Sequence, residues 1–329
     1  MNLSKRVQKP RKNLEKLKRY YKYAILKLTP KTYQKKKINR LFELYYKKAN
    51  AYERKNILQR VDYYNKLDDK FYINKELSTY QTLNIKKTGS WFYHYDLTMQ
   101  LAAFTENSLF HYLPGDVQTI PDTPTFVKSR PISQENKNSV LLKLNTIRHF
   151  NFIKDPFHYA EKKDLLVWRG ACYQPHRRYF IENFHSHPLC NAGDTSRDAE
   201  LGKKPFMSIQ EQLTYKFILS IEGNEVASNL KWIMSSNSLC FMVKPKFETW
   251  FMEGLLIPNF HYVELKEDYS DLDEKINFYL KNEDAAVRII ENANDYIKQF
   301  LNHDRENLIS YLVAQKYLLM SGQHIKAPL

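Results

Sequence analysis

The sequence predicts an α/β fold that follows a basic helical extension. In the second half of the chain, short apolar runs alternate with helical patterns of ten or more residues, which is typical of parallel β-α-β units. One run, at 164–170, is apolar enough to be a buried strand. Residues 1–60 contain 20 Lys or Arg and 3 Glu, a net charge of +17, whereas the whole chain carries +15. The remainder is therefore a nearly neutral body.

The composition limits the class of protein. The 329 residues, of which 43% are apolar, suffice for one large domain or two of ordinary size. Three cysteines form no regular framework, which suits a reducing compartment. No run of about 18 apolar residues occurs, and no apolar segment with a cleavage site follows the basic N-terminus. We expect a cytoplasmic protein without a spanning helix or a secretory signal.

The basic extension, residues 1–60, is predicted to be helical. Between Pro10 and Pro30, apolar residues recur at helical spacing and lysines occupy the other faces; the run 35–49 repeats this pattern. Basic amphipathic helices bind anionic lipid, at about 1 kcal/mol per basic residue near the surface. The alternatives are a solvated helix packed on its own domain, and nucleic acid. The body lacks a basic stripe with base-reading groups, so we expect a membrane surface and no nucleic acid.

The body is predicted to start with mixed structure and continue with alternating elements. The segment 123–132 is predicted to be a strand that ends at Pro131, and 139–150 a helix whose first part also fits a strand. A boundary is expected within 150–160. Further strands are predicted at 164–170, 238–243 and 261–265, and helices at 208–223 (with a strand as the alternative for its end), 227–237, 247–256, 271–282, 283–302 and 306–320.

The end of the strand at 164–170 suggests an anion site. Arg169 and Gly170 come directly after buried apolar residues, and ligands of open α/β sheets lie outside the carboxyl ends of strands. Arginine binds phosphate through two N–H groups, and glycine lets a ligand approach the backbone. Arg177, soon after, can add charge to the same site. The alternative is an arginine paired with a neighbouring carboxylate.

Two helix starts have capping signals. Ser208 and Glu211 have the spacing of a capping box. Ser228 is predicted to cap the next helix, with Asn229 and Lys231 in its first turn, an arrangement that can bind phosphate. The alternative is a simple cap beside a solvated lysine.

No metal site is expected. The Asp271-Leu272-Asp273 triplet resembles a metal-binding signature, but Asp271 and Glu274 have capping-box spacing, which we favour. Two cysteines and three histidines within 172–190 are too irregularly spaced for zinc. The glycine motifs of dinucleotide oxidoreductases, P-loop enzymes and α/β-hydrolases do not occur.

Several segments together resemble glycosyltransferase family 90. This family includes Rumi-type protein O-glucosyltransferases, fungal capsule-associated proteins and bacterial lipooligosaccharide glycosyltransferases. The similarity covers about 120–320, and the N-terminal extension and missing secretory signal look most like the bacterial members. The segments that carry the resemblance are VWRG (167–170), 222–242, ETWF (248–251), PNFHYVEL (258–265) and 271–286.

The resemblance implies a GT-B-type fold with two Rossmann-like halves. It implies an acceptor-side domain at 61–155, a UDP-sugar-binding domain at 156–300, and a C-terminal helix at 301–329 that crosses back to the first. It also implies an inverting transfer of a hexose (glucose or galactose) from a UDP-sugar to an inner-core sugar of lipooligosaccharide or lipopolysaccharide, here expected to be heptose. No cofactor or obligatory metal is implied. The enzyme is then expected at the inner face of the inner membrane.

The resemblance also assigns residues to the donor. Arg169 with Gly170 is placed to meet the diphosphate, with Arg177 nearby. The stretch from Ser228 through Asn229 to Lys231 matches the nucleotide-binding helix start. Glu248 is a candidate to accept hydrogen bonds from the ribose hydroxyls, with helix capping near 247 as the alternative.

The catalytic base is the main departure from the family pattern. Eukaryotic relatives carry an Asp soon after an Arg; Arg130 matches that Arg on the acceptor side, but Pro131 follows it. An inverting transfer still needs a base near the acceptor hydroxyl. We favour Asp96, next to His94 on the acceptor side, because its aromatic neighbours suggest partial burial; the alternatives are Asp122 and Glu135. The missing Asp also keeps open a non-catalytic, membrane-surface adaptor.

Overall fold

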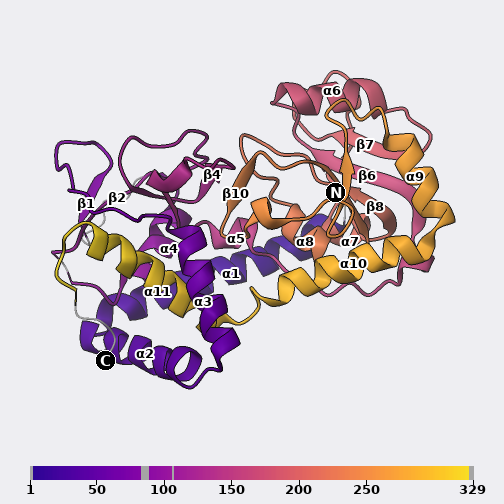
Figure 1. The fold of residues 1–329 in the computed structure, drawn as a ribbon. Coiled ribbons are helices and arrows are strands. Elements are labelled where there is room, and N and C mark those ends of the chain that lie inside the picture. The colour runs from indigo at the N-terminus through magenta and orange to yellow at the C-terminus, as the bar shows by residue number, and fades with distance from the viewer. Residues whose placement is uncertain (1–2, 83–88, 106, 326–329) are drawn as a thin grey trace. The chain divides into compact units, whose positions relative to one another are not determined.

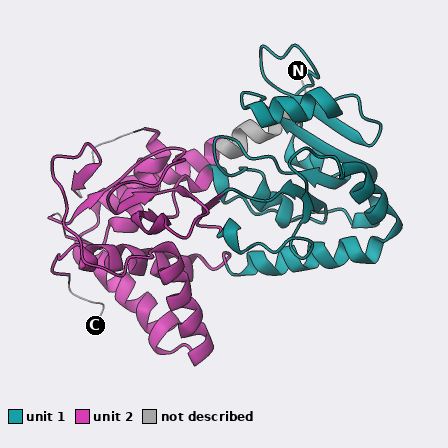
Figure 2. Ribbon diagram, turned by 45° about the horizontal axis from the view of Figure 1, so that its top comes forward, with its two compact units in different colours: residues 1–5, 148–246, 252–299 teal, residues 6–147, 247–251, 300–329 magenta. Residues whose placement is uncertain are grey.

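The computed structural model describes residues 3–82, 89–105 and 107–325 (Figure 1). The chain divides into two units, coloured separately in Figure 2. The described residues of unit 1 lie within 3–5, 148–246 and 252–299, and those of unit 2 within 6–147, 247–251 and 300–325. Each unit is therefore assembled from segments that are distant in the sequence.

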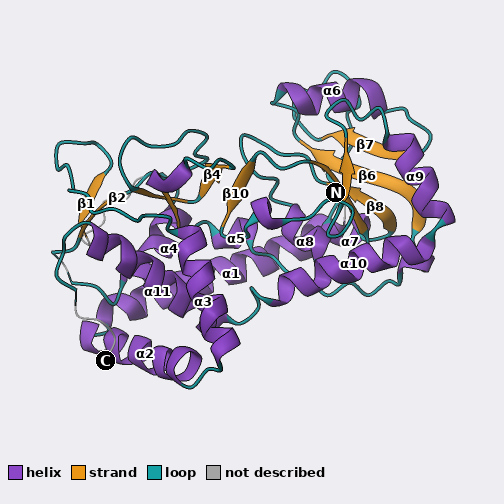
Figure 3. Ribbon diagram, in the orientation of Figure 1, coloured by secondary structure: helices purple, strands orange, loops and turns teal. Residues whose placement is uncertain are grey.

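Unit 1 is built on a five-stranded parallel sheet (Figure 3). Its spatial order is β11-β9-β8-β6-β7, and every neighbouring pair is parallel. The strands are β6 (Lys163–Gly170), β7 (Cys190–Asp194), β8 (Tyr215–Leu219), β9 (Leu239–Val243) and β11 (Val263–Leu265). The predicted α/β fold with parallel strands is confirmed for this unit.

The helices of unit 1 bury one face of this sheet. Successive side chains of a strand point to opposite faces, and Leu166, Trp168 and Phe217 belong to one buried apolar cluster. Phe180 and Ile276, from two of the helices, join the same cluster. The helices of the unit are α6 (Pro175–Phe184), α7 (Ile209–Gln212), α8 (Leu230–Met234), α9 (Leu272–Lys281) and α10 (Glu283–Lys298), with 3₁₀ turns at Tyr159–Glu161 and Glu253–Leu255.

Unit 2 combines helices with short strand pairs. Within its described residues no sheet has more than two strands. The pairs are β1 (Tyr80–Thr82) with β2 (Leu109–His111), β3 (Thr125–Val127) with β5 (Ser139–Leu141), and β4 (Ser129–Pro131) with β10 (Phe247–Thr249). The helices are α1 (Leu3–Leu28), α2 (Lys31–Phe42), a π-helical turn (Glu43–Lys47), α3 (Ala51–Tyr64), α4 (Trp91–Leu101) and α11 (His303–Met320).

The helical prediction for the basic extension is confirmed by α1, α2 and α3. Helix α11 packs against α2, α3 and α4, so it connects the other helices of the unit. The predicted end of the extension at residue 60 falls inside α3. There Arg60 is buried and pairs with Glu306 of α11, with 2.5 Å between Nη1 and Oε1. The last turns of the extension are thus part of the core of unit 2. Within the described ranges, none of the helices has the length and apolar character to cross a membrane.

Three predicted elements need correction. The helix predicted at 247–256 is wrong: residues 247–249 form β10, and Met252 has a left-handed φ of 57°, which a helix cannot accommodate. The helix predicted at 139–150 is a strand at its start, β5, and a single turn, α5 (Thr146–His149), at its end. The segment 208–223 contains only the short α7, followed by strand β8.

The caps agree with the sequence at one helix and differ at two. Ser208 and Glu211 form the predicted capping box of α7. Helix α8 begins one residue later than predicted, with Asn229 rather than Ser228 at its cap position. Asp271 precedes α9 but does not cap it, because its Oδ1 accepts a hydrogen bond from the Lys266 backbone N–H instead.

Candidate functional site

The strand order of unit 1 points to one place on the sheet. If the five strands are numbered 1 to 5 along the chain, their order across the sheet is 2-1-3-4-5. The first strand, β6, therefore lies between the second, β7, and the third, β8. The connections that leave β6 and β8 therefore turn in opposite directions. Open α/β sheets bind ligands outside the carboxyl ends of the strands at such a switch point. The candidate site consists of the residues that follow β6 and β8.

Gly170 ends β6 at this switch point. A Cβ on this residue would lie 2.6 Å from the indole ring of Trp168, two residues earlier on the strand. The glycine is therefore required by the packing of the tryptophan. The space that a Gly170 side chain would fill is occupied by that ring, so the approach of a ligand to this backbone stays a prediction.

Arg177, in the first turn of α6, joins the two loops of the switch point. Its Nη1 donates to the Ala171 carbonyl after β6 at 3.1 Å, and its Nε and Nη2 donate to the carbonyls of Glu222 and Ile221 after β8 at 2.8 and 3.0 Å. Burial lowers the pKa of this guanidinium. All its described acceptors are neutral carbonyl groups, so its positive charge is available to an anion.

The residues before α8 secure the end of β8. Asn229 donates to the Leu219 carbonyl at 3.1 Å and accepts a hydrogen bond from the Ser220 hydroxyl at 3.1 Å. Ser228 is half-buried beside it. Lys231 lies deeper: it is fully buried and its ammonium forms an ion pair with Glu253. Its charge is therefore already balanced by a carboxylate.

Arg169 is turned toward the neighbouring strand β7. Its Nη1 donates to the Asn191 carbonyl at 2.5 Å and its Nη2 to the Asn191 side-chain oxygen at 2.8 Å. Nη1 also donates to the Trp168 carbonyl at 2.8 Å. No carboxylate of the described chain pairs with it, so the ion-pair alternative is wrong for these residues. Asn191 had no signal in the sequence, because the contact depends on the register of two strands.

Asp96 is a buried carboxyl group on α4. Its oxygens accept hydrogen bonds from the Thr146 backbone N–H at 2.7 Å, the Thr146 hydroxyl at 3.0 Å and Arg19 Nη1 at 3.2 Å. The predicted burial is confirmed, with 5% of the residue exposed. Burial raises the pKa of Asp96 to about 6, although Arg19 acts in the opposite direction. Asp122 and Glu135, the alternative bases, are exposed.

The same part of α4 binds α1. His94 lies 2.9 Å from the Tyr23 hydroxyl, through its Nε2 atom. The ring of Tyr23 also contacts Trp91 edge-on, with 5.8 Å between centroids. Asp96 and His94, predicted for the acceptor side, therefore hold one face of the basic extension on unit 2.

Arg130 and Glu248 meet in unit 2. They face each other across β4 and β10, and Arg130 Nε donates to Glu248 Oε1 at 2.7 Å. Tyr63 donates its hydroxyl to the other oxygen of Glu248. The structure thus joins a residue predicted for the acceptor to one predicted for the ribose. Arg169, Gly170, Arg177 and Asn229 instead belong to unit 1.

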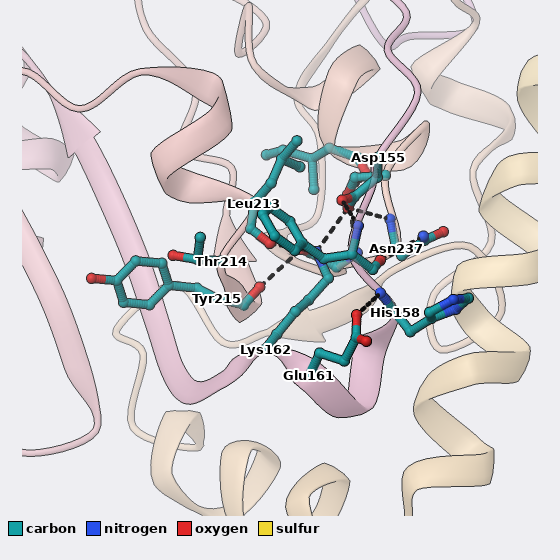
Figure 4. Close-up of polar contacts among 12 residues, drawn as sticks. Asp155, His158, Glu161, Lys162, Leu213, Thr214, Tyr215 and Asn237 are labelled. Atoms are coloured by element: carbon teal, nitrogen blue, oxygen red, sulfur yellow. Dashed lines mark hydrogen bonds and ion pairs between the residues drawn. The ribbon is translucent and has the colours of Figure 1, made fainter. Parts of the chain in front are cut away.

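A second buried ion pair in unit 1 lies at the amino ends of the strands (Figure 4). Lys162 Nζ lies 2.7 Å from Asp155 Oδ2 and 2.5 Å from the Leu213 carbonyl. Asp155 also accepts from the Asn237 backbone N–H at 2.9 Å. Lys162, Leu213 and Asn237 precede β6, β8 and β9, so the pair fastens the amino ends of three strands. No local pattern predicts this pair, which is distant from the carboxyl ends of the strands, where ligands bind.

The cysteines and histidines of 172–190 make separate contacts. His176 Nε2 lies 2.8 Å from the Glu222 carbonyl, and His187 Nε2 lies 3.0 Å from the Asp273 carboxylate. Among the residues that the structure describes, no group of three His, Cys, Asp or Glu side chains is arranged to hold a metal ion.

Comparisons with known proteins give a consistent result. The family model described as glycosyl transferase family 90 matches residues 145–317, which include the whole parallel sheet. O-glucosyltransferase LpsA of Dichelobacter nodosus is 43% identical over 312 residues, which are 94% of this chain and 97% of that protein. Protein O-glucosyltransferase 3 of Homo sapiens is 27% identical over 167 residues, 48% of this chain and 32% of that protein. Protein O-glucosyltransferase 1 of Homo sapiens is 26% identical over 166 residues, 46% of this chain and 42% of that protein.

Proposed function

Since the chain belongs to glycosyl transferase family 90 and is a glycosyltransferase, we propose that it moves glucose from a UDP-sugar to an inner-core sugar, heptose, of a bacterial lipooligosaccharide. The observation that carries this proposal is the similarity, along almost the full length of both chains, to a protein named as an O-glucosyltransferase. Galactose is the alternative hexose. The transfer is inverting and takes place at the inner face of the membrane.

The donor diphosphate lies outside the carboxyl ends of β6 and β8. Arg177 carries a charge there that no described carboxylate balances. When the bond from sugar to phosphate breaks, negative charge accumulates on the leaving UDP. Arginine groups that are already in place stabilise that charge, which is the work a metal ion does in other transferases. The proposal therefore includes no obligatory metal.

The nucleotide contacts at the end of β8 come from Ser228 and Asn229. Asn229 is held by Leu219 and Ser220, so its position is defined before a ligand arrives. A direct contact from Lys231 requires that it leaves Glu253. A contact from the ribose to Glu248 likewise requires that Glu248 gives up Arg130 or Tyr63.

The proposed base is Asp96, with Asp122 and Glu135 as alternatives. A base works best when its pKa lies near the working pH, and burial brings the pKa of Asp96 to about 6. Asp96→Asn should abolish transfer and leave UDP affinity unchanged. Near-normal transfer by this variant would assign Asp96 to the attachment of α1, through Arg19, and not to catalysis.

The anionic membrane partner is proposed to bind the outward face of α1. One stripe of this helix, with side chains every three or four residues, is apolar and 44–85% exposed; its members are Leu14, Leu17, Tyr21, Ile25 and Leu28. Lysines flank it, and Arg19 and Tyr23 attach the other face to α4. An apolar stripe with a basic border is the arrangement of interfacial helices. A GT-B arrangement also belongs to this proposal, with the parallel sheet of unit 1 as its nucleotide-binding half; the described residues of unit 2 have no sheet of more than two strands.

The experiment is a ligand panel on wild type and Arg177→Ala in the presence of EDTA. A ligand that binds only the folded state raises the melting temperature. UDP and UDP-glucose should stabilise the wild type, whereas GDP and CMP should not, and the effect should be reduced in Arg177→Ala. No stabilisation by any nucleotide, with binding to anionic lipid retained, would favour the non-catalytic adaptor instead.

A further inference from the structure

Two cations share one acceptor on the β7 side of β6, the strand that borders the switch point. We propose that Arg169 and Lys204 form one subsite for a phosphate group of the donor diphosphate, and that Asn191 is the positioning residue that holds both. This inference rests on the proposed function, because it names residues for the donor of that same site. Lys204 and Asn191 were not singled out from the sequence.

The backbone places Lys204 at the carboxyl end of β7. Its N–H donates to the carbonyl of Asp194, the last residue of β7, at 2.9 Å. From there its side chain runs back along the strand and lies on Gly193. A Cβ on Gly193 would be 2.5 Å from the Lys204 Cβ and 2.9 Å from its Cγ and Cδ. The glycine therefore creates the channel that the lysine stem occupies.

The same glycine explains how Lys204 reaches Arg169. Gly193 is the register partner of Arg169 across β7 and β6. Since β7 has no side chain at this position, the lysine stem passes over the strand there. Lys204 Nζ lies 3.2 Å from the Asn191 side-chain oxygen, and Arg169 Nη2 lies 2.8 Å from that oxygen. One neutral amide oxygen thus accepts from both cations.

The charges of this subsite are unbalanced. Neither Arg169 nor Lys204 has an ion pair with any described carboxylate. Burial lowers the pKa of Lys204, and the charge of Arg169 lowers it further. Arg169 Nε is buried and has no acceptor among the residues that the structure describes. One anion with several oxygens can balance the charge of both cations and accept a hydrogen bond from the unused Nε donor. Phosphate is such an anion.

Asn191 holds both cations in place without cancelling their positive charge. Its own side-chain amide donates to the hydroxyl of Tyr215 at 2.5 Å, which fixes the direction of the oxygen. A carboxylate at this position would also hold both cations, but it would neutralise one of them. An amide orders the pair and leaves both charges for the ligand.

The experiment compares Lys204→Met with Lys203→Met in the full-length protein. Lys203 is the matched control, because it is the adjacent, exposed lysine and its Nζ donates to a neutral group, the Arg197 carbonyl. UDP and uridine are titrated calorimetrically in EDTA. A charged hydrogen bond to phosphate accounts for a loss of roughly tenfold or more. We expect Lys204→Met to weaken the binding of UDP by that factor and to leave the binding of uridine unchanged. Lys203→Met should weaken the binding of neither ligand.

Asn191→Asp tests the positioning role separately. The added carboxylate should pair with both cations, so the melting temperature without ligand should stay the same or rise while UDP affinity falls roughly tenfold or more. If Asn191 has only a structural role, the melting temperature and the UDP affinity should fall together. If Arg177→Ala loses UDP but Lys204→Met behaves like Lys203→Met, the subsite is overturned and the donor proposal stands. If the wild type itself does not bind UDP, the proposed function fails.

Discussion

Arg130 and Glu248 are 118 positions apart in the chain, yet they form a buried ion pair across β4 and β10, with 2.7 Å between Nε and Oε1. Both side chains are at most 3% exposed. The sequence predicts Arg130 for the acceptor side and Glu248 for the nucleotide. Their contact shows that the two residues have a common structural task in unit 2, which is to fasten the strand at 247–249 to the strand at 129–131.

The first prediction concerns this pair. Glu248→Gln leaves the buried guanidinium of Arg130 without its counter-charge, which typically lowers the free energy of unfolding by about 3–5 kcal/mol. Urea denaturation measures it. Lys137→Met is the control, because its ion pairs with Asp68 and Asp69 are exposed and it should leave stability unchanged. If Glu248→Gln keeps its stability and loses UDP affinity, Glu248 contacts the nucleotide as the sequence predicted.

The second prediction concerns the pH dependence contributed by Asp96. Its folded pKa of about 6 is above the ordinary value of 3.8. Between these values the folded state binds more protons than the unfolded state, so stability falls as the pH rises through this window. Relative to Asp96→Asn, the wild type should lose about 2 kcal/mol of unfolding free energy between pH 4.5 and pH 7.5. A constant difference would mean that Arg19 and Thr146 hold the carboxyl charged throughout.

The third prediction concerns the exposed stripe of α1. Leu17 is 64% exposed, and burying a leucine in the lipid interface contributes about 1.5–3 kcal/mol. Leu17→Glu should therefore weaken binding to phosphatidylglycerol vesicles roughly tenfold or more, as measured by co-sedimentation. Asn13→Glu, which adds the same charge at an exposed polar residue one turn before Leu17 and removes no apolar side chain, should weaken it less. Equal losses would mean that charge alone directs the binding.

A deletion of residues 1–60 would not be a clean test of lipid binding by the extension. Such a deletion removes Arg60, the closer of two cations that pair with the buried Glu306 carboxylate. Lys143 Nζ, at 3.5 Å, would remain as the more distant partner. A truncated protein would lose stability whether or not the extension binds lipid.

The fourth prediction concerns the ion pair at the amino ends of the strands. Lys162 and Asp155 have side chains that are at most 1% exposed. Lys162→Met should lower the free energy of unfolding by about 3–5 kcal/mol, because Asp155 is left charged and buried. The UDP affinity of the folded protein should not change, since the site lies at the other ends of these strands. Lys163→Met, at the exposed neighbouring lysine, is the control for stability. A selective loss of UDP affinity in Lys162→Met would contradict this assignment.

Much of unit 1 was predictable because its signals are local. The apolar run before Arg169 and Gly170 predicted the end of β6 at the residue where it lies, and the alternation of strands and helices predicted the parallel sheet. The family resemblance, confirmed by the match to residues 145–317, followed from motifs in the same region. A local pattern of apolar residues is sufficient where the element packs on its neighbours in sequence.

The predictions that were wrong depend on distant partners. Residues 247–249 have a helical pattern but pair with 129–131, so the strand partner overrides local preference. The contact of Arg169 with Asn191 follows from the register of β6 with β7, which no local pattern encodes. For the same reason, the lysine at 204 could not be distinguished from its neighbour at 203 until the strands were in place.

The proposed activity is tested by a transfer assay with the purified full-length protein. UDP-glucose labelled in the sugar is incubated in EDTA with lipooligosaccharide that lacks its core glucose, and the product is examined by mass spectrometry and by NMR of the anomeric proton. The proposed function predicts one added hexose, joined with the anomeric configuration inverted relative to the donor, and no product from Arg177→Ala. Transfer that requires a divalent metal, a retained configuration, or no transfer from any UDP-hexose would contradict it.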